Sequence, residues 1–173
     1  TTAMTMMAFA PLSPALPHIA KAFSDTPNVE YITRIALTIP SLGIILVSPF
    51  VGMLVDRIGR KKILLFSITV YALSGTVVFW VTSIEELLFS RLITGVALAG
   101  IMTSATALAG DYFSGVARQR FMSQRGAFVN YAAVILNLVG GLLVTINWRA
   151  VFIVFTIGLV MLPVAFRTLA NDE

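Results

Sequence analysis

Six long stretches of this chain carry almost no charged side chains, and this pattern constrains the fold more than any other feature. Each stretch is close to the ~20 residues that a helix needs to cross ~30 Å of hydrocarbon. Only 12% of the residues are charged, whereas a soluble domain uses about a quarter of its residues in this way to cover its surface. The chain is therefore predicted to be an all-α membrane protein.

The uncharged stretches predict one bundle of six transmembrane helices within residues 1–173. The expected spans are about 1–20, 35–55, 63–84, 87–110, 126–147 and 150–167. Eight lysine and arginine residues follow the second, fourth and sixth spans, and fewer follow the others. Because positively charged loops stay on the cytoplasmic side, we expect both chain ends to lie in the cytoplasm.

The polar composition excludes several classes of protein. The sequence has no cysteine and a single histidine, His18, so thiol catalysis and Cys- or His-rich metal sites are not expected. The basic residues sit in short gaps rather than in a stripe interleaved with aromatics, which argues against a nucleic-acid partner. The sequence contains no nucleophile motif and no phosphate-binding loop. We expect no enzyme activity, no metal and no cofactor.

Three prolines, Pro11, Pro14 and Pro17, crowd the first span. Proline removes a backbone donor and clashes with the preceding helical turn. Such residues are tolerated in membrane helices where neighbours satisfy the freed backbone groups. We therefore expect the outer half of this span to bend or unwind.

The densest group of unusual residues is the run GMLVDRIGRKK over residues 52–62, between the second and third spans. Asp56 ends a helix, where the macrodipole disfavours an anion, so it requires a cationic partner such as Arg60. Gly52 and Gly59 bracket it, which suggests a close helix contact or an unusual backbone angle. This run predicts a functional turn rather than a plain connection.

The 52–62 run resembles the loop signature between the second and third helices of the major facilitator superfamily. Arg91 and Gly95 are similar to the fourth-helix motif of that family, with Thr94 where glutamine is often found. The resemblance implies the amino-terminal six-helix bundle of a drug-efflux-like transporter, built as a 3+3 inverted repeat and located in a bacterial inner membrane. It also implies a cluster of Asp56, Arg60 and Asp111, in which Asp111 pairs with Arg60.

The conformational switch implied by this resemblance lies at the cytoplasmic end of the bundle. Its expected members are Gly52, Asp56, Arg57, Gly59, Arg60 and Asp111. The alternative is that these charges are solvated groups at helix ends, which contribute little to the stability of the fold.

Arg91 is the one formal charge inside an otherwise apolar span, one turn before Gly95. Charge within a membrane is costly and marks a functional site by default. We therefore assign Arg91 a role in coupling. The alternative is that its side chain reaches the outer head groups or Glu86.

Asn130 and Asn137 lie seven residues apart, and so on one face of the fifth helix. Their amides either hydrogen-bond to neighbouring helices or line a wet cavity. The segment 136–141 of the same helix resembles the fifth-helix motif that drug antiporters of this superfamily carry. Leu136 and Asn137 replace its Gly-Pro step, while Gly140 and Gly141 remain. This departure weakens an antiporter assignment and leaves the superfamily resemblance in place.

The function that these features predict is secondary transport of a small molecule by alternating access, with efflux of drugs or metabolites favoured. The expected partners are the substrate, the lipid bilayer and a second six-helix bundle, which is either a carboxyl-terminal half or a second copy of the chain. No carboxylate lies deep in any span, so the coupling ion stays open. The alternative is a membrane interaction or structural module without transport activity of its own.

Overall fold

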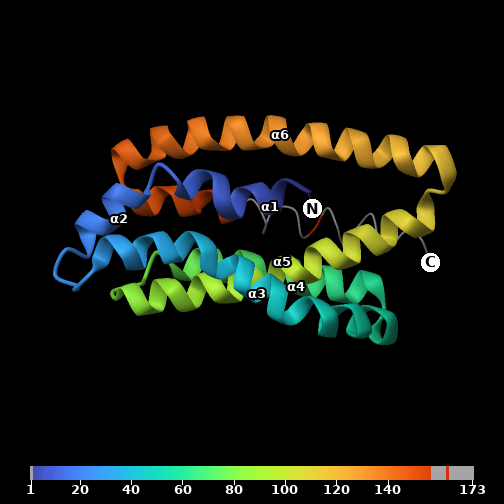
Figure 1. Ribbon diagram of the computed structural model, residues 1–173, viewed down its shortest axis with the longest axis horizontal. Coiled ribbons are helices and arrows are strands. Elements are labelled where there is room, and N and C mark those ends of the chain that lie inside the picture. The colour runs from blue at the N-terminus through green and yellow to red at the C-terminus, as the bar shows by residue number, and fades with distance from the viewer. Residues whose placement is uncertain (1, 157–162, 164–173) are drawn as a thin grey trace.

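The computed structural model describes residues 2–156 and 163, and in this part of the chain every regular element is a helix. The long helices run antiparallel to their sequence neighbours, so their turns gather at the two ends of an elongated bundle (Figure 1). The elements are α1 (Thr2–Phe9), η1 (Ala10–Leu12), α2 (Leu16–Ala22), α3 (Val29–Ile58), α4 (Arg60–Val77), α5 (Ile84–Tyr112), α6 (Gly115–Ile146) and η2 (Trp148–Phe152).

Three of these helices, α3, α5 and α6, are long and apolar enough to cross a membrane. Helix α4 contains the stretch predicted as the third span, but its 18 residues include three basic side chains in the first turn. The first predicted span is divided into shorter pieces. The sixth, 150–167, begins in η2, and most of it lies outside the described residues. The described structure thus shows an all-helical chain with three long apolar helices.

The break in the first span falls where its prolines are concentrated. Helix α1 ends at Phe9, a single 3-10 turn contains Pro11, and α2 begins at Leu16 with Pro17 in its first turn. The 3-10 turn packs against α6, where a Cβ on Gly140 would stand 2.7 Å from Cα of Pro11. The predicted unwinding is therefore confirmed, and the neighbouring α6 backbone covers it.

Helix α5 is the centre of the bundle and packs against both α3 and α4. Its contact with α3 is close because glycines face the partner backbone. A Cβ on Gly95 would stand 2.7 Å from Cα of Pro40, and one on Gly43 would stand 2.8 Å from the carbonyl oxygen of Leu92. Small residues of this kind let membrane helices approach closely.

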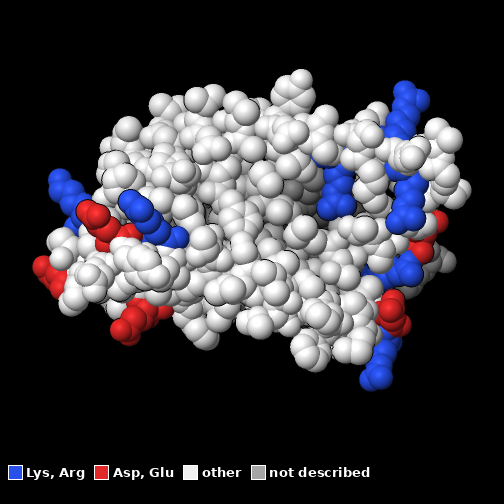
Figure 2. Space-filling model, in the orientation of Figure 1, with Lys and Arg blue, Asp and Glu red and all other residues white. Residues whose placement is uncertain are grey.

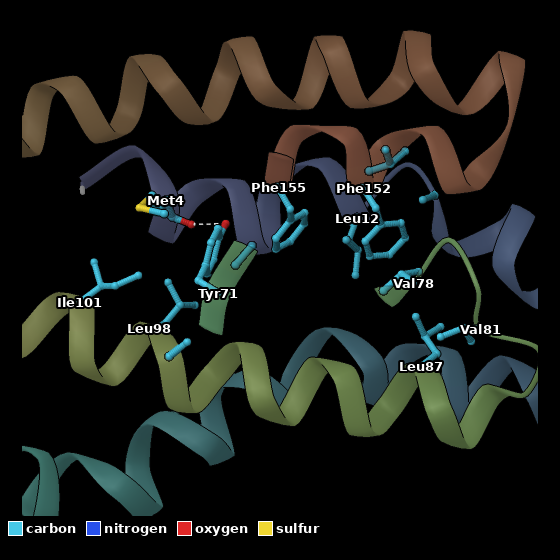
Figure 3. Packing of buried hydrophobic residues seen from close by; sticks show 14 of the residues in the cluster. Met4, Leu12, Tyr71, Val78, Val81, Leu87, Leu98, Ile101, Phe152 and Phe155 are labelled. Atoms are coloured by element: carbon cyan, nitrogen blue, oxygen red, sulfur yellow. Dashed lines mark hydrogen bonds between the residues drawn. The ribbon is translucent and has the colours of Figure 1, made fainter. Parts of the chain in front are cut away.

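The hydrophobic core joins α1 and the segment after α6 to α4 and α5 (Figure 3). Tyr71 of α4 stacks on Phe155 with a centroid separation of 5.0 Å, and Phe155 also stacks on Phe152. The Tyr71 hydroxyl donates a hydrogen bond to the carbonyl oxygen of Met4 at 2.8 Å. This bond satisfies the only polar group of a fully buried ring.

Two turns at the end opposite the 52–62 run are held by side chains. Ser83 and Glu86 form a capping box at the start of α5. Arg149 donates through its two terminal nitrogens to the carbonyl oxygens of Phe79 and Val81, both at 2.7 Å. These bonds tie η2 to the α4–α5 connection.

Replacing Gly95 with alanine is expected to destabilise the bundle. The added methyl group meets the α3 backbone, which cannot move aside as a side chain can, and overpacking of this kind costs about 1–3 kcal/mol. Gly141→Ala is the matched control, because a Cβ at Gly141 meets nothing within 4 Å. Thermal unfolding in lipid nanodiscs should show a lower midpoint for Gly95→Ala alone, and equal midpoints would contradict the close crossing.

Candidate functional site

Basic side chains gather at one end of the bundle, which we call the basic end (Figure 2). It comprises the α3–α4 and α5–α6 turns with the adjoining helix segments. Its charged residues are Asp56, Arg57, Arg60, Lys61, Lys62, Asp111, Arg118, Arg120 and Arg125. The turns at the other end carry three basic and four acidic side chains. Counted over the described residues, the two ends therefore differ in the sign of their net charge.

The α3–α4 turn depends on the backbone of Gly59. This residue ends α3 and precedes α4 with φ +106° and ψ 141°, a conformation that side chains with a Cβ rarely adopt. The unusual backbone angle predicted here is confirmed. The reversal is so tight that Arg60 becomes the first residue of α4 and faces the end of α5.

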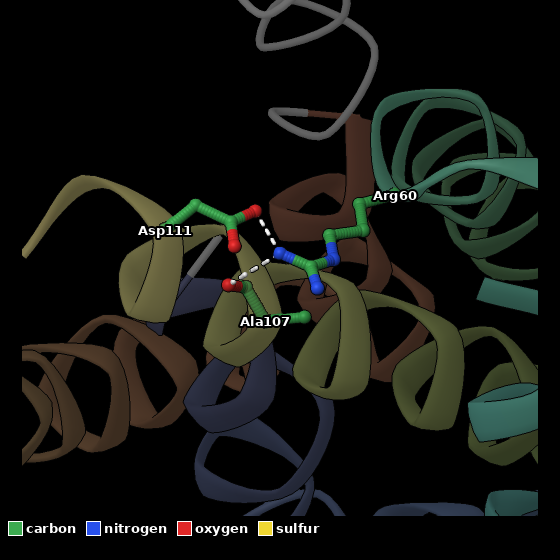
Figure 4. Close-up of polar contacts among 3 residues, drawn as sticks. All are labelled: Arg60, Ala107 and Asp111. Carbon is green, nitrogen blue, oxygen red and sulfur yellow. Dashed lines mark hydrogen bonds and ion pairs between the residues drawn. The ribbon is translucent and has the colours of Figure 1, made fainter. Parts of the chain in front are cut away.

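Arg60 joins α4 to the end of α5 (Figure 4). Its Nη1 forms an ion pair with the Asp111 carboxylate and donates to the carbonyl oxygen of Ala107 at 3.3 Å. The Asp111 side chain is 51% exposed and that of Arg60 is 36% exposed, so water screens the pair only in part. The structure thus brings together two residues that are 51 positions apart in the sequence.

Asp56 does not join this pair within the described residues. It is exposed in the last turn of α3, and no ion pair or hydrogen bond connects it to Arg60 there. Arg57 beside it is also exposed. Gly52 lies inside α3, and a Cβ there would meet nothing within 4 Å. Neither a close contact nor a positive φ therefore explains this glycine inside the described bundle.

Arg91 is the largest fully buried side chain of the described structure, with a relative exposure of 0%. Its guanidinium does not reach Glu86, whose carboxylate instead accepts hydrogen bonds from the backbone nitrogens of Thr82 and Ser83. The alternative in which Arg91 extends to the outer surface is therefore wrong for this structure.

The surroundings of the Arg91 guanidinium are aromatic rather than acidic. Its Cζ lies 4.9 Å from the ring centroid of Phe152 and 4.7 Å from that of Phe155. None of its three nitrogens has a hydrogen-bond partner among the described residues. A desolvated cation is stabilised electrostatically by the faces of aromatic rings. This stabilisation does not replace the hydrogen bonds to water that the cation loses on burial. The two phenylalanines were not identified from the sequence, where they read as ordinary apolar residues of the sixth span.

A buried hydroxyl network on α4 and α5 lies one turn from Arg91. The hydroxyls of Ser74 and Thr94 are 2.9 Å apart, and Ser90 donates to the carbonyl oxygen of Ser74 at 2.6 Å. Thr94 stands where the resembling motif often has glutamine, and here its hydroxyl joins the two helices. This network gives Arg91 no hydrogen-bond partner among the residues that the structure describes.

Asn130 and Asn137 are both exposed on α6. The amide nitrogen of Asn137 donates to the carbonyl oxygen of Ala133, one turn earlier in its own helix, at 3.0 Å. Neither amide bonds to a neighbouring helix within the described residues. The described structure therefore places both amides on an uncovered face of α6.

Comparison with known proteins identifies the family of the chain. The family model of the Major Facilitator Superfamily matches residues 1–173. Multidrug resistance protein 2 of Bacillus subtilis is 31% identical over 62% of the chain and 27% of its own length. Methylenomycin A resistance protein of the same organism is 30% identical over 69% of the chain and 26% of its own length. A triacylglyceride transporter of Mycobacteroides abscessus is 30% identical over 72% of the chain and 24% of its own length.

These matches cover about a quarter of the length of each relative, whereas the family match extends along the whole chain. Together with the long apolar helices, they make the protein an integral membrane protein. The chain belongs to the major facilitator superfamily of membrane transporters.

Proposed function

We propose that the chain is a six-helix bundle of an efflux-type carrier that moves small molecules by alternating access. A second six-helix bundle completes the carrier, supplied either by a carboxyl-terminal segment or by a second copy of the chain. The substrate is held between the two bundles near the midplane. The drug-resistance names of two relatives support efflux of drugs or metabolites.

The observation that carries this proposal is the arrangement of the α3–α4 turn. Arg60 is engaged by Asp111, while Asp56 stays exposed at a helix end whose dipole disfavours it. An anion held in that position gains from a partner outside the bundle, such as a cation or the amino end of a helix. Gly52, with open space over its α carbon, would let a second bundle approach α3 closely.

In this mechanism the turn acts as a switch. When Asp56 contacts the second bundle, the basic end is closed, and loss of that contact lets it open. Gly59 and the Arg60–Asp111 pair keep the turn rigid, so that movement of the second bundle changes one contact rather than deforming the loop. Arg57 lies beside Asp56 and adds positive charge at the same surface.

Arg91 is proposed as the residue that couples substrate or ion binding to the conformational change. A buried guanidinium that no described residue hydrogen-bonds is stabilised by any anionic or carbonyl group that reaches it. If one state of the cycle supplies such a group and the other does not, the difference biases the equilibrium between the two. Gly95 supports this role by allowing α5 to pack closely on α3.

The exposed amides of Asn130 and Asn137 are proposed to line the cavity between the bundles. Large apolar side chains of α6 such as Leu138 and Leu142 are exposed nearby, at 65% and 70%, and a partner bundle or lipid would cover them. The excess of positive charge at the basic end supports the proposal that this end, and both chain ends, lie in the cytoplasm. The membrane would be the inner membrane of a bacterium.

A membrane interaction module without transport activity is the second candidate. The exposed apolar face of α6 would suit the second bundle of a carrier and the binding partner of such a module equally well. The two functions differ in their dependence on Asp56 and Arg91. A module needs the α6 face alone, whereas a carrier also needs the switch and the buried charge.

Asp56→Asn is expected to lower efflux at least about tenfold, since it removes the charge that holds the closed state. The measurement is efflux of a fluorescent drug from efflux-deficient bacterial cells that express the complete gene product containing this chain. Asp25→Asn, the same change in an exposed residue at the opposite end, should leave efflux unchanged. Unchanged efflux in Asp56→Asn, at normal membrane levels, would remove the switch role.

Arg91→Lys is expected to reduce efflux strongly although the charge is retained. Lysine lacks the planar fork that lies against Phe152 and Phe155 and can meet a ligand at two points. The same efflux measurement applies, with Arg120→Lys in the exposed part of α6 as control. Full activity in Arg91→Lys would show that only the positive charge matters.

A further inference from the structure

A pocket of about 700 Å³ opens at the basic end, where α5 lies between α3 and the start of α6. Its volume falls in the range of small-molecule sites, roughly 300–1,000 Å³. The lining residues are Ile44, Ser48, Arg60, Ala99, Met102, Thr103, Thr106, Ala107, Gly110, Asp111 and Arg118. Four helices therefore contribute to one concave surface.

The pocket has an apolar part and a polar part. Ile44, Ala99 and Met102 supply aliphatic surface. Thr103 and Thr106, which carry hydroxyls, also line the pocket and follow Ala99 and Met102 along α5 toward the charged residues. A ligand that matches this surface needs an apolar body and a polar head group.

The charge at the polar part is positive. Arg60 is neutralised by Asp111, which is the one acidic residue among those that line the pocket. The Arg118 guanidinium lies against Gly110, where an added Cβ would stand 3.8 Å from its Nη2. Arg125 of α6 donates from Nη1 to the Thr106 hydroxyl at 3.3 Å. Arg118 and Arg125 thus lie beside the Arg60–Asp111 ion pair, and no described carboxylate pairs with either of them. Figure 2 shows basic side chains around a hollow at this end.

We propose that this pocket binds amphipathic anions: molecules with a carboxylate, sulfonate or phosphate head group and an apolar body. Arg118 and Arg125 contact the head group, the threonine hydroxyls donate to it, and Ile44 and Met102 cover the apolar body. A cationic amphiphile finds no unpaired carboxylate here and meets two like charges instead. The head group can belong to a dissolved solute or to an anionic phospholipid.

Binding at this pocket does not require transport, so a binding measurement tests the proposal. The full chain is placed in phosphatidylcholine nanodiscs, and binding of dansylaminoundecanoate is followed by fluorescence. The methyl ester of the same probe is the uncharged control. We expect the acid to bind at least about tenfold more tightly than the ester, because close arginines favour the charged head group.

The double variant Arg118→Gln/Arg125→Gln is expected to remove this preference. Arg120→Gln, which changes an exposed arginine outside the pocket, should retain it. Arg118→Lys/Arg125→Lys keeps both charges and should also retain it, which separates loss of charge from misfolding. Equal binding of acid and ester by the unmodified chain, or an unchanged preference in the double glutamine variant, would overturn the proposal.

A second set of nanodiscs with equal parts of phosphatidylcholine and phosphatidylglycerol identifies the source of the head group. If phosphatidylglycerol displaces the probe, the pocket is an anionic lipid site. If the probe stays bound, the pocket is a solute site, and amphipathic anions become the substrate class of the carrier proposed above. Efflux that persists in the double glutamine variant would leave the transport function standing even if the anion site failed.

Discussion

The close crossing of α5 on α3 is the contact on which the rest of the bundle depends. Gly43 and Gly95 let the two backbones meet, and this places α5 at the centre, with α4 on its other side. The same arrangement holds Arg91 inside the core and sets Asp111 opposite Arg60. In a lipid environment, where apolar side chains gain little by leaving solvent, such close packing is a main source of helix association.

Charge is distributed in three ways along this bundle. Exposed charges gather at the two ends of the described bundle. The Arg60–Asp111 pair stabilises the turn that carries the proposed switch. Arg91 alone stays desolvated without a counter-ion among the described residues, at a cost that packing against Phe152 and Phe155 offsets only in part. The coupling role proposed for Arg91 rests on this uncompensated burial.

Much of the fold could be predicted from the sequence, because the features concerned act locally. Charge-free length identified α3, α5 and α6, clustered prolines identified the break after Phe9, and Gly59 signalled a backbone that only glycine adopts readily. The site was predicted less fully. That Arg91 lies against Phe152 and Phe155 depends on how distant segments pack, and hydropathy treats those rings as ordinary apolar residues. Arg118 and Arg125 read as topology charges, because the pocket that Arg118 lines and the Thr106 hydroxyl that Arg125 binds come beside them only when α6 folds back along α5.

The central claim is that the exposed face of α6 borders a water-filled cavity between two bundles. The chain contains no cysteine, so single cysteines can be introduced without removing others. Asn137→Cys in the complete gene product should react with a membrane-impermeant maleimide, whereas Leu73→Cys, on the exposed face of α4, should be shielded by lipid and remain unlabelled. The carrier mechanism predicts that the maleimide labels Asn137→Cys and does not label Leu73→Cys. Equal absence of labelling at both positions would show that lipid or protein covers the α6 face, and it would contradict the water-filled cavity.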